Sequence, residues 1–206
     1  MIQEELPEEL QEVLGELINI AFGSATATIA DLFDNFATLH VPAISFVALD
    51  ELDTFIFQDF NLQDVYTTTQ QFKGRFQGEV VFAMDRHSAR NMQRIIFADE
   101  GPGSQEILDD DELKQSILEI SNILGSSCIG KLAELLGTNV TFAPPSIEFA
   151  DTLTQERRAL SYRHIIVIST VLDFKDMEVA GKLFIMFTDE MFNWLHTALN
   201  NYLENI

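Results

Sequence analysis

The stretch from Glu16 to Phe33, ELINIAFGSATATIADLF, decides the fold because its pattern returns 103 residues later. The second copy, EISNILGSSCIGKLAEL, runs from Glu119 to Leu135. In both copies a Glu is followed three residues later by Asn, among apolar residues spaced as in an amphipathic helix. Asn and Gly are poor helix formers. Their presence inside two long helices therefore needs an explanation beyond helix formation.

An internal duplication is predicted along most of the chain. At the same offset of 103, Pro42 corresponds to Pro145, and GEVVFAMD from Gly78 corresponds to GKLFIMFT from Gly181. Chance matches between apolar residues are common, whereas Glu, Asn, Pro and Gly all matching is not. We expect one domain made of two repeats joined by a turn-rich segment, with these bounds: repeats at about 1–103 and 104–206, and the junction at 98–106.

Each repeat is predicted to run helix, three strands, helix. Periods near 3.6 residues indicate helices, and alternation with β-branched content indicates strands. The expected helices span about 7–33, 86–97, 111–136 and 189–203, and the expected strands span 43–52, 67–77, 78–85, 146–153, 163–174 and 181–188. The expected class is an α+β, pseudo-twofold domain, in which two long motif-bearing helices flank an antiparallel sheet.

A polar stripe is predicted on one face of each long helix. At 100° per residue, the stripe residues of the first helix lie within about 60° of one another: Glu12, Glu16, Asn19 and Gly23. The stripe of the second helix consists of Gln115, Glu119, Asn122 and Ser126. The apolar residues fall on the opposite sides: Leu10, Val13, Leu14, Leu17, Ala21, Ala25, Thr28 and Leu32, and then Leu113, Ile117, Ile120, Leu124 and Cys128. A solvated helix face is the simplest interpretation, but it would not need Asn twice at one offset.

Composition restricts the classes of function. The 206 residues are 47% hydrophobic, and the formal net charge of −21 argues against binding nucleic acid or anionic membranes. The single cysteine, Cys128, rules out an internal disulfide and fits a reducing cytoplasm. The acidic start MIQEELPEEL lacks a signal-peptide pattern, and no apolar run reaches about 18 residues. We expect a cytoplasmic protein without membrane insertion.

The two Glu-x-x-Asn pairs are each followed, after 22 residues, by Pro. This pattern resembles the CheC/CheX/FliY family of chemotaxis phosphatases, and CheC most of all. ELINIAFGSATATIADLF resembles the first CheC helix and LEISNILGSSCIGKLAELL the second, and the resemblance spans nearly the whole chain because duplication is itself a CheC feature. The family usually has Asp or Ser four residues before the Glu, where this chain has Glu12 and Gln115.

The resemblance implies a hydrolase that removes the aspartyl phosphate from a CheY-type response regulator in chemotaxis or related two-component signalling. The implied catalytic residues are Glu16, Asn19, Glu119 and Asn122, and the implied binding residues are Glu12, Gln115, Gly23 and Ser126. Asn would position the attacking water, as a Gln does in GTPases, and Glu would pair with the regulator's Lys. The chain would need no cofactor of its own, since the regulator supplies Mg²⁺, and CheD is implied as a second partner.

Two other functions fit parts of the sequence. The flagellar switch protein FliM shares the fold expected from the resemblance and binds CheY without the Glu/Asn pair, so a non-catalytic adaptor is the main alternative. Intact pairs in both repeats favour the enzyme. A generic acidic interaction domain would leave the repeated motif unexplained.

The remaining reactive residue types give weaker signals. The four histidines have no ligand spacing, so no metal site is expected: His40, His87, His164 and His196. Cys128 lies on an apolar stripe and is expected to be a buried small hydrophobic residue. Phe72, Phe76 and Phe82 occupy alternating strand positions, which predicts a place in the core.

Overall fold

The computed structural model describes residues 6–33, 38–39, 43–58, 60, 64–96, 109–149, 164–174, 178–188 and 191–204. Its helical elements are α1 (Glu8–Phe33), the 3-10 turn η1 (Leu49–Glu51), α2 (Leu52–Phe57), α3 (Arg86–Ile96), α4 (Asp110–Leu135) and α6 (Phe192–Glu204). Its strands are β1 (Thr38–Leu39), β2 (Ala43–Ala48), β3 (Val65–Gly74), β4 (Gly78–Asp85), β5 (Val140–Phe142), β6 (Ser146–Phe149), β7 (His164–Phe174) and β8 (Val179–Thr188). The predicted junction at 98–106 and Pro42 lie outside the described residues.

The described strands form one sheet in which every pairing is antiparallel. The strand order is β1-β7-β8-β4-β3-β5, with β2 paired to β7 and β6 paired to β3. From β1 to β5, this order takes one strand from the first half, two from the second, two from the first and one from the second. Each half contributes four of the described strands, one more than predicted. The expected α+β class is confirmed, and the two halves share a sheet.

The strand pairing of the first half is repeated in the second. The central strands β4 and β8 pair Val81 with Phe184, its own counterpart at the offset of 103. The outer pairings match as well, Thr38 with Asp173 and Thr141 with Lys73. These pairings relate β1 to β5 at an offset of 103 but β3 to β7 at an offset of 100, so that Lys73 is equivalent to Asp173. This is the arrangement of a pseudo-twofold axis between β4 and β8, and it supports the predicted duplication.

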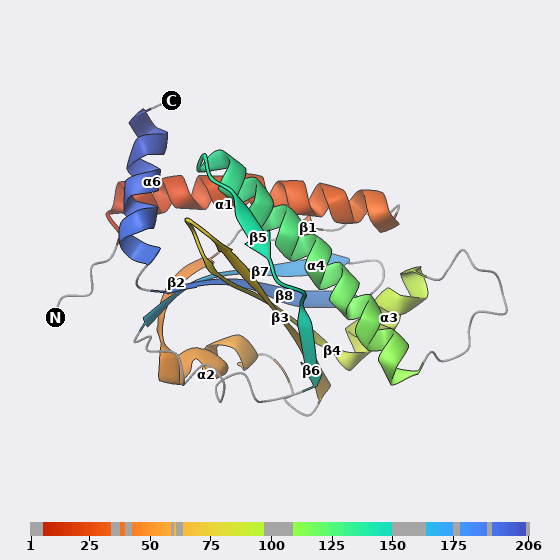
Figure 1. Ribbon diagram of the computed structural model, residues 1–206. Coiled ribbons are helices and arrows are strands. Elements are labelled where there is room, and N and C mark those ends of the chain that lie inside the picture. The colour runs from red at the N-terminus through yellow and green to blue at the C-terminus, as the bar shows by residue number, and fades with distance from the viewer. Residues whose placement is uncertain are drawn as a thin grey trace.

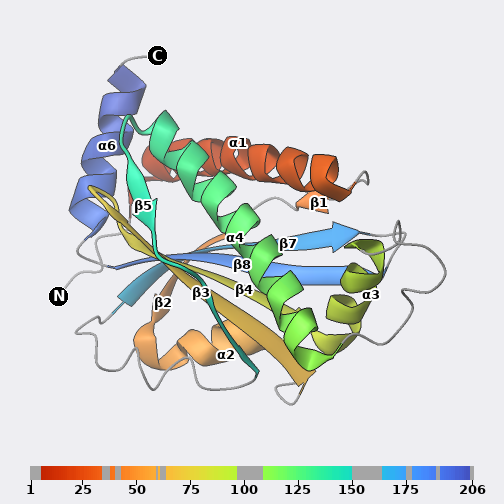
Figure 2. The same cartoon turned by 45° about the vertical axis from the view of Figure 1, so that its right-hand side comes forward.

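The helices are distributed unequally over the two faces of the sheet (Figure 1). The long helices α1 and α4 cross each other above one face, and the short α2 lies beneath the other (Figure 2). Helices α3 and α6 stand at opposite ends of the layer formed by α1 and α4 (Figure 2). The two motif-bearing helices are therefore the outer layer of the same face.

Two hydrophobic cores stabilise this arrangement because each face of the sheet buries its own set of side chains. The larger core joins α1, α4, α3 and α6 to the sheet and includes the predicted core residues Phe72, Phe76 and Phe82, each nearly or fully buried. Phe76 also stacks on Trp194 of α6, with ring centroids 5.5 Å apart. The smaller core lies under α2 and includes Leu52, Ile56 and Phe57.

The predicted strand at 43–52 is wrong in its last four residues. The strand ends at Ala48, and the chain then forms η1 and α2. Leu52, Ile56 and Phe57 are buried at spacings of four and one, which is a helical pattern rather than a strand pattern. Covering the second face of the sheet is the physical reason for this helix.

Both ends of α4 are capped. At the start, the Asp109 side chain accepts hydrogen bonds from the backbone N–H groups of Asp111 and Glu112, and Glu112 closes the capping box. At the end, Gly137 adopts a φ of 63°, and the N–H of Thr138 donates to the carbonyl of Ala133 at 2.9 Å. This is a Schellman ending, which glycine makes accessible. The position of α4 is therefore defined at both termini.

Candidate functional site

The two polar stripes lie where the sequence predicts them, on the outer faces of α1 and α4. Glu16 and Asn19 are exposed on α1, and Glu119 and Asn122 are exposed on α4. The predicted binding residues Glu12, Gly23 and Gln115 are exposed as well, and Ser126 is half-buried. Each Glu and its Asn sit three residues apart on one helix face, so they project together.

The opposite sides of both helices are buried, except that Val13 is half-buried and Thr28 is exposed; the side chain of Leu32 is not described. Leu14, Leu17 and Ala25 of α1 and Cys128 of α4 have at most 1% exposure, as predicted. Burial raises the pKa of the Cys128 thiol well above its ordinary value. Thr28, expected on the buried side, is exposed, and its hydroxyl donates to the Ser24 carbonyl at 3.0 Å. Its place among the core residues is taken by Ile29.

The two asparagines have different surroundings. The Asn122 Oδ1 atom accepts a hydrogen bond of 2.6 Å from Nε2 of Gln70, on β3 beneath the helix. The same Nε2 donates to the Ala143 carbonyl at 3.1 Å. Among the described residues, no side chain or backbone group makes a hydrogen bond with the Asn19 side chain. Sequence reasoning missed Gln70, because nothing in TTTQQF relates it to Asn122.

A polar cluster anchors the N-terminal end of α4 to the sheet. The Tyr66 hydroxyl donates to Asp110 at 2.6 Å, and Lys114 pairs with the same carboxylate at 2.9 Å. Arg86 bridges Asp110 and Asp64, and lies over the Tyr66 ring. The Tyr66 and Lys114 hydrogen bonds lower the pKa of Asp110, while burial, followed by the hydrogen bond to Asp110, raises the pKa of Tyr66 to about 12. These contacts hold α4 against β3 below the stripe.

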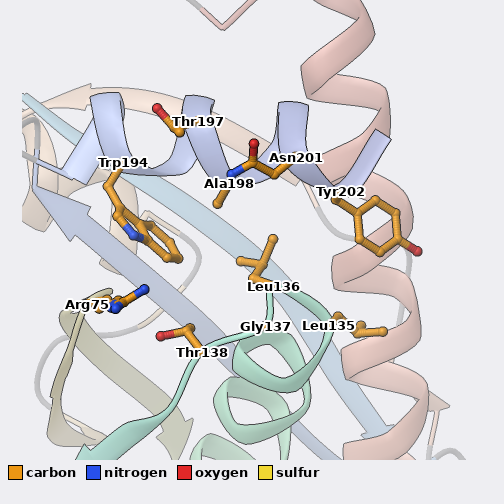
Figure 3. Close-up of a pocket in the computed structure, with 10 residues that line it drawn as sticks. All are labelled: Arg75, Leu135, Leu136, Gly137, Thr138, Trp194, Thr197, Ala198, Asn201 and Tyr202. Atoms are coloured by element: carbon orange, nitrogen blue, oxygen red, sulfur yellow. The ribbon is translucent and has the colours of Figure 1, made fainter. Parts of the chain in front are cut away.

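A pocket of about 330 Å³ lies away from both stripes, between the end of α4, one side of α6 from Trp194 to Tyr202, and Arg75 in the β3–β4 turn (Figure 3). The Trp194 indole lies above Arg75 on one side of it, and Leu136 and Gly137 lie to their right in this view (Figure 3). None of the predicted site residues lines this pocket. The candidate site is therefore a helix surface, a form that suits a macromolecular partner better than a small substrate.

No cluster of three or more His, Cys, Asp or Glu suited to a metal ion occurs among the described residues. His87 is exposed beside Asn91 and Glu178, and His196 contacts Asn200. His40 lies outside the described residues, and the side chain of His164 is likewise not described.

Helix α1 is, by length and composition alone, apolar enough over Glu8–Asp31 to cross a membrane. This differs from the sequence expectation that no segment qualifies. Leu14, Leu17 and Ile18 of this helix are completely buried against the rest of the protein, whereas Glu12 and Glu16 are exposed. A core helix of a globular protein meets the same test, so the finding is weak evidence for a membrane segment.

Comparisons with known proteins agree with this fold. A family model described as chemotaxis phosphatase CheX matches residues 66–169. The chain is 23% identical over 202 residues to the CheY-P phosphatase CheC of Bacillus subtilis strain 168, covering 94% of this chain and 95% of CheC. The crystal structure of Thermotoga maritima FliY is similar with a TM-score of 0.74 at 19% identity, covering 96% of this chain and 98% of FliY. The FliM middle domain of Vibrio alginolyticus gives 0.63 at 13% identity, covering 89% and 98%.

The chain belongs to the CheX family of chemotaxis phosphatases. The resemblance to the CheC/CheX/FliY group is thereby confirmed, and at the level of the family the activity is that of a phosphatase in chemotaxis. The similarity to FliY and FliM shows the shared fold.

Proposed function

We propose that this protein accelerates hydrolysis of the aspartyl phosphate on a CheY-type response regulator. The observation that carries the proposal is the pair of exposed Glu/Asn sets, Glu16 with Asn19 and Glu119 with Asn122, each on a 26-residue helix packed against the sheet. A rigid convex helix can enter a partner's active site, which a concave pocket cannot do. The family membership and the similarity to CheC support the same activity.

In the proposed reaction, the oxygen of a water molecule attacks the phosphorus, and the bond from phosphorus to the regulator's carboxylate oxygen breaks. The products are inorganic phosphate and a free aspartate. Asn19 or Asn122 would hold the water in line, because a carboxamide can accept from the water and donate to a phosphoryl oxygen. Positioning of this kind needs no covalent step on the phosphatase.

Glu16 and Glu119 are proposed to fix the register of the complex by pairing with a lysine of the regulator. Each carboxylate is exposed and three residues from its Asn, so both groups would enter the partner's site together. The regulator's Mg²⁺ would neutralise charge on the phosphoryl group, and this chain would hold no cofactor itself. Glu12, Gln115, Gly23 and Ser126 would form the surrounding contact surface.

The setting proposed for this activity is the cytoplasm, where response regulators act. The net charge of −21 would favour docking to a basic regulator surface. CheD is proposed as a second partner on the basis of the family resemblance, and no residue of this chain is assigned to it.

The decisive experiment measures phosphate release from a phosphorylated CheY-type regulator of the same organism. The wild type should accelerate release, and the double variant Asn19→Ala/Asn122→Ala should lose roughly 100-fold. Each single variant should retain the activity of the other helix. Asn19 is exposed, so Asn19→Ala should leave thermal unfolding nearly unchanged. Asn122→Ala also removes an acceptor of the buried Gln70 amide and should lower Tm. The rates are therefore compared at a temperature at which every variant is folded, which separates lost chemistry from lost folding.

Binding without catalysis would reverse the conclusion. If the wild type binds the phosphorylated regulator but leaves its phosphate lifetime unchanged, the protein is an adaptor of the FliM type for that partner. If the wild type is active, the variants Glu16→Gln and Glu119→Gln test whether the two glutamates act in docking or in the chemical step. We expect these variants to raise KM for the regulator more than they lower kcat, because the proposed carboxylate contact forms on docking.

A further inference from the structure

We propose that Gln70 is a positioning residue that orients the Asn122 carboxamide from beneath, so that the site on α4 is pre-organised and the site on α1 is not. This inference rests on the proposed function for its catalytic consequence. Gln70 is only 3% exposed and lies on β3. It reaches the exposed helix face only through its hydrogen bond to Asn122.

The Ala143 carbonyl determines the direction of the hydrogen bonds in this chain of amides. A backbone carbonyl can only accept, so the Gln70 atom 3.1 Å from it must be the amide nitrogen. That nitrogen has a second hydrogen, which points to Asn122 at 2.6 Å. The Asn122 atom facing Gln70 must therefore be the oxygen. Its amino group and the second lone pair of its oxygen remain available to a phosphoryl oxygen and a water molecule.

Gly125 allows this contact to form. It is buried on α4, one turn from Asn122, where the helix lies against β3. A Cβ at this position would lie 3.0 Å from Oε1 of Gln70 and 3.3 Å from Cγ1 of Val80. A larger residue would have to displace either the Gln70 amide or the helix. The glycine thus keeps Asn122 within reach of the strand.

A glutamine at position 70 destabilises the fold, so packing alone does not explain its presence there. Oε1 of Gln70 is buried and has no hydrogen-bond partner in the structure. An unpaired buried carbonyl is destabilising, so an apolar residue of similar shape would serve the core at least as well. A role in orienting Asn122 accounts for the amide at this position.

The first repeat lacks both parts of this arrangement. The position equivalent to Gly125 is Phe22, which is buried, and the position equivalent to Gln70 in the strand register is Thr170. The Asn19 side chain has no hydrogen-bond partner among the described residues. The two sites therefore differ in how far the carboxamide is oriented before the regulator arrives.

The test replaces Gln70 by the near-isosteric, apolar Met in the background Asn19→Ala, which isolates the site on α4. Gln70→Met should lower kcat for regulator dephosphorylation roughly 10- to 100-fold while KM changes less than about twofold. Thermal stability should be equal or higher, because Ala143 is exposed and water can replace the lost partner of its carbonyl. The matched control is Gln71→Met, the neighbouring exposed glutamine, whose amide contacts Glu79.

A second readout does not depend on activity. Nitrogen-15 relaxation of the Asn122 side-chain amide should show a rigid group in the Asn19→Ala parent and a mobile one in Gln70→Met, with no change in Gln71→Met. If kcat is unchanged, or if it falls while the Asn122 amide stays rigid, the positioning role is overturned. If the parent and the wild type both lack phosphatase activity, the proposed function fails. The relaxation data alone then decide whether Gln70 orients Asn122.

Discussion

The variant Gly23→Ala should have opposite effects on the stability of α1 and on docking of the regulator to this helix. Gly23 is exposed inside the helix, and no heavy atom lies within 4 Å of the place where a Cβ would stand. Ala is favoured over Gly in helix interiors by about 0.8–1.0 kcal/mol. The variant should therefore be more stable, with Tm raised by about 2–4 °C for a domain of this size.

The same methyl group should impair the reaction. It would stand one turn beyond Asn19, where the regulator is proposed to approach closely. Forcing an extra methyl group into a packed contact costs about 1–3 kcal/mol, which corresponds to roughly 5- to 150-fold in binding. The loss should appear in kcat/KM for regulator dephosphorylation, measured in the background Asn122→Ala so that only the α1 site contributes.

Gly130→Ala is the matched control for this experiment. Gly130 also lies inside a long helix, and an added Cβ would likewise meet no atom within 4 Å, but it is eight residues beyond Asn122, about 12 Å further along the helix axis. It should give the same gain in Tm with no loss of rate in either single-site background. A Gly23→Ala variant that is stabilised and fully active would refute the idea that this glycine makes room for the regulator.

Two further predictions concern the scaffold. Gly181→Ala should destabilise the fold by about 1–3 kcal/mol in chemical denaturation, because its Cβ would lie 2.6 Å from a ring carbon of the fully buried Phe82; equal or higher stability would contradict this. Tyr66→Phe should cost about 0.5–1.5 kcal/mol at neutral pH through the lost bond to Asp110. Because folding raises the pKa of Tyr66 to about 12, its contribution is present below about pH 10 and is lost as pH rises toward 12. The wild type should lose more stability over that range than Tyr66→Phe, in which only other groups such as Lys114 titrate; equal losses would show that the hydrogen bond is absent in solution.

The long helices could be predicted because their signals are local. The expected bounds of α1 and α4, about 7–33 and 111–136, differ from those observed by one residue at the start of α1 and by one residue at each end of α4. Strand β4 spans 78–85 as predicted. In each case the apolar period and the end signals lie in the same stretch of sequence, so no distant contact is needed to recognise the element.

The features that could not be predicted depend on distant contacts. Helix α2 forms because the sheet has a second face to cover, and nothing within 43–52 reveals that need. The bond from Gln70 to Asn122 joins residues 52 apart in sequence, and it depends on Gly125, where a Cβ would lie 3.0 Å from Oε1 of Gln70. Thr28 was misplaced for a related reason, since Ile29 lies one position further around α1 and fills the core instead.

The structure also gives a physical reason for expecting the two proposed sites to be unequal. Ordering a side chain costs conformational entropy. A carboxamide that is already ordered before the complex forms should therefore position a water molecule at a smaller cost in free energy. On α4, the capping box, the Schellman ending and Gln70 all restrict the position of Asn122 before binding. On α1, the proposed mechanism would require the regulator itself to order Asn19. We therefore expect the two Glu-x-x-Asn motifs to support the proposed catalysis to different extents, with the difference arising from the strand beneath the helix rather than from the motif.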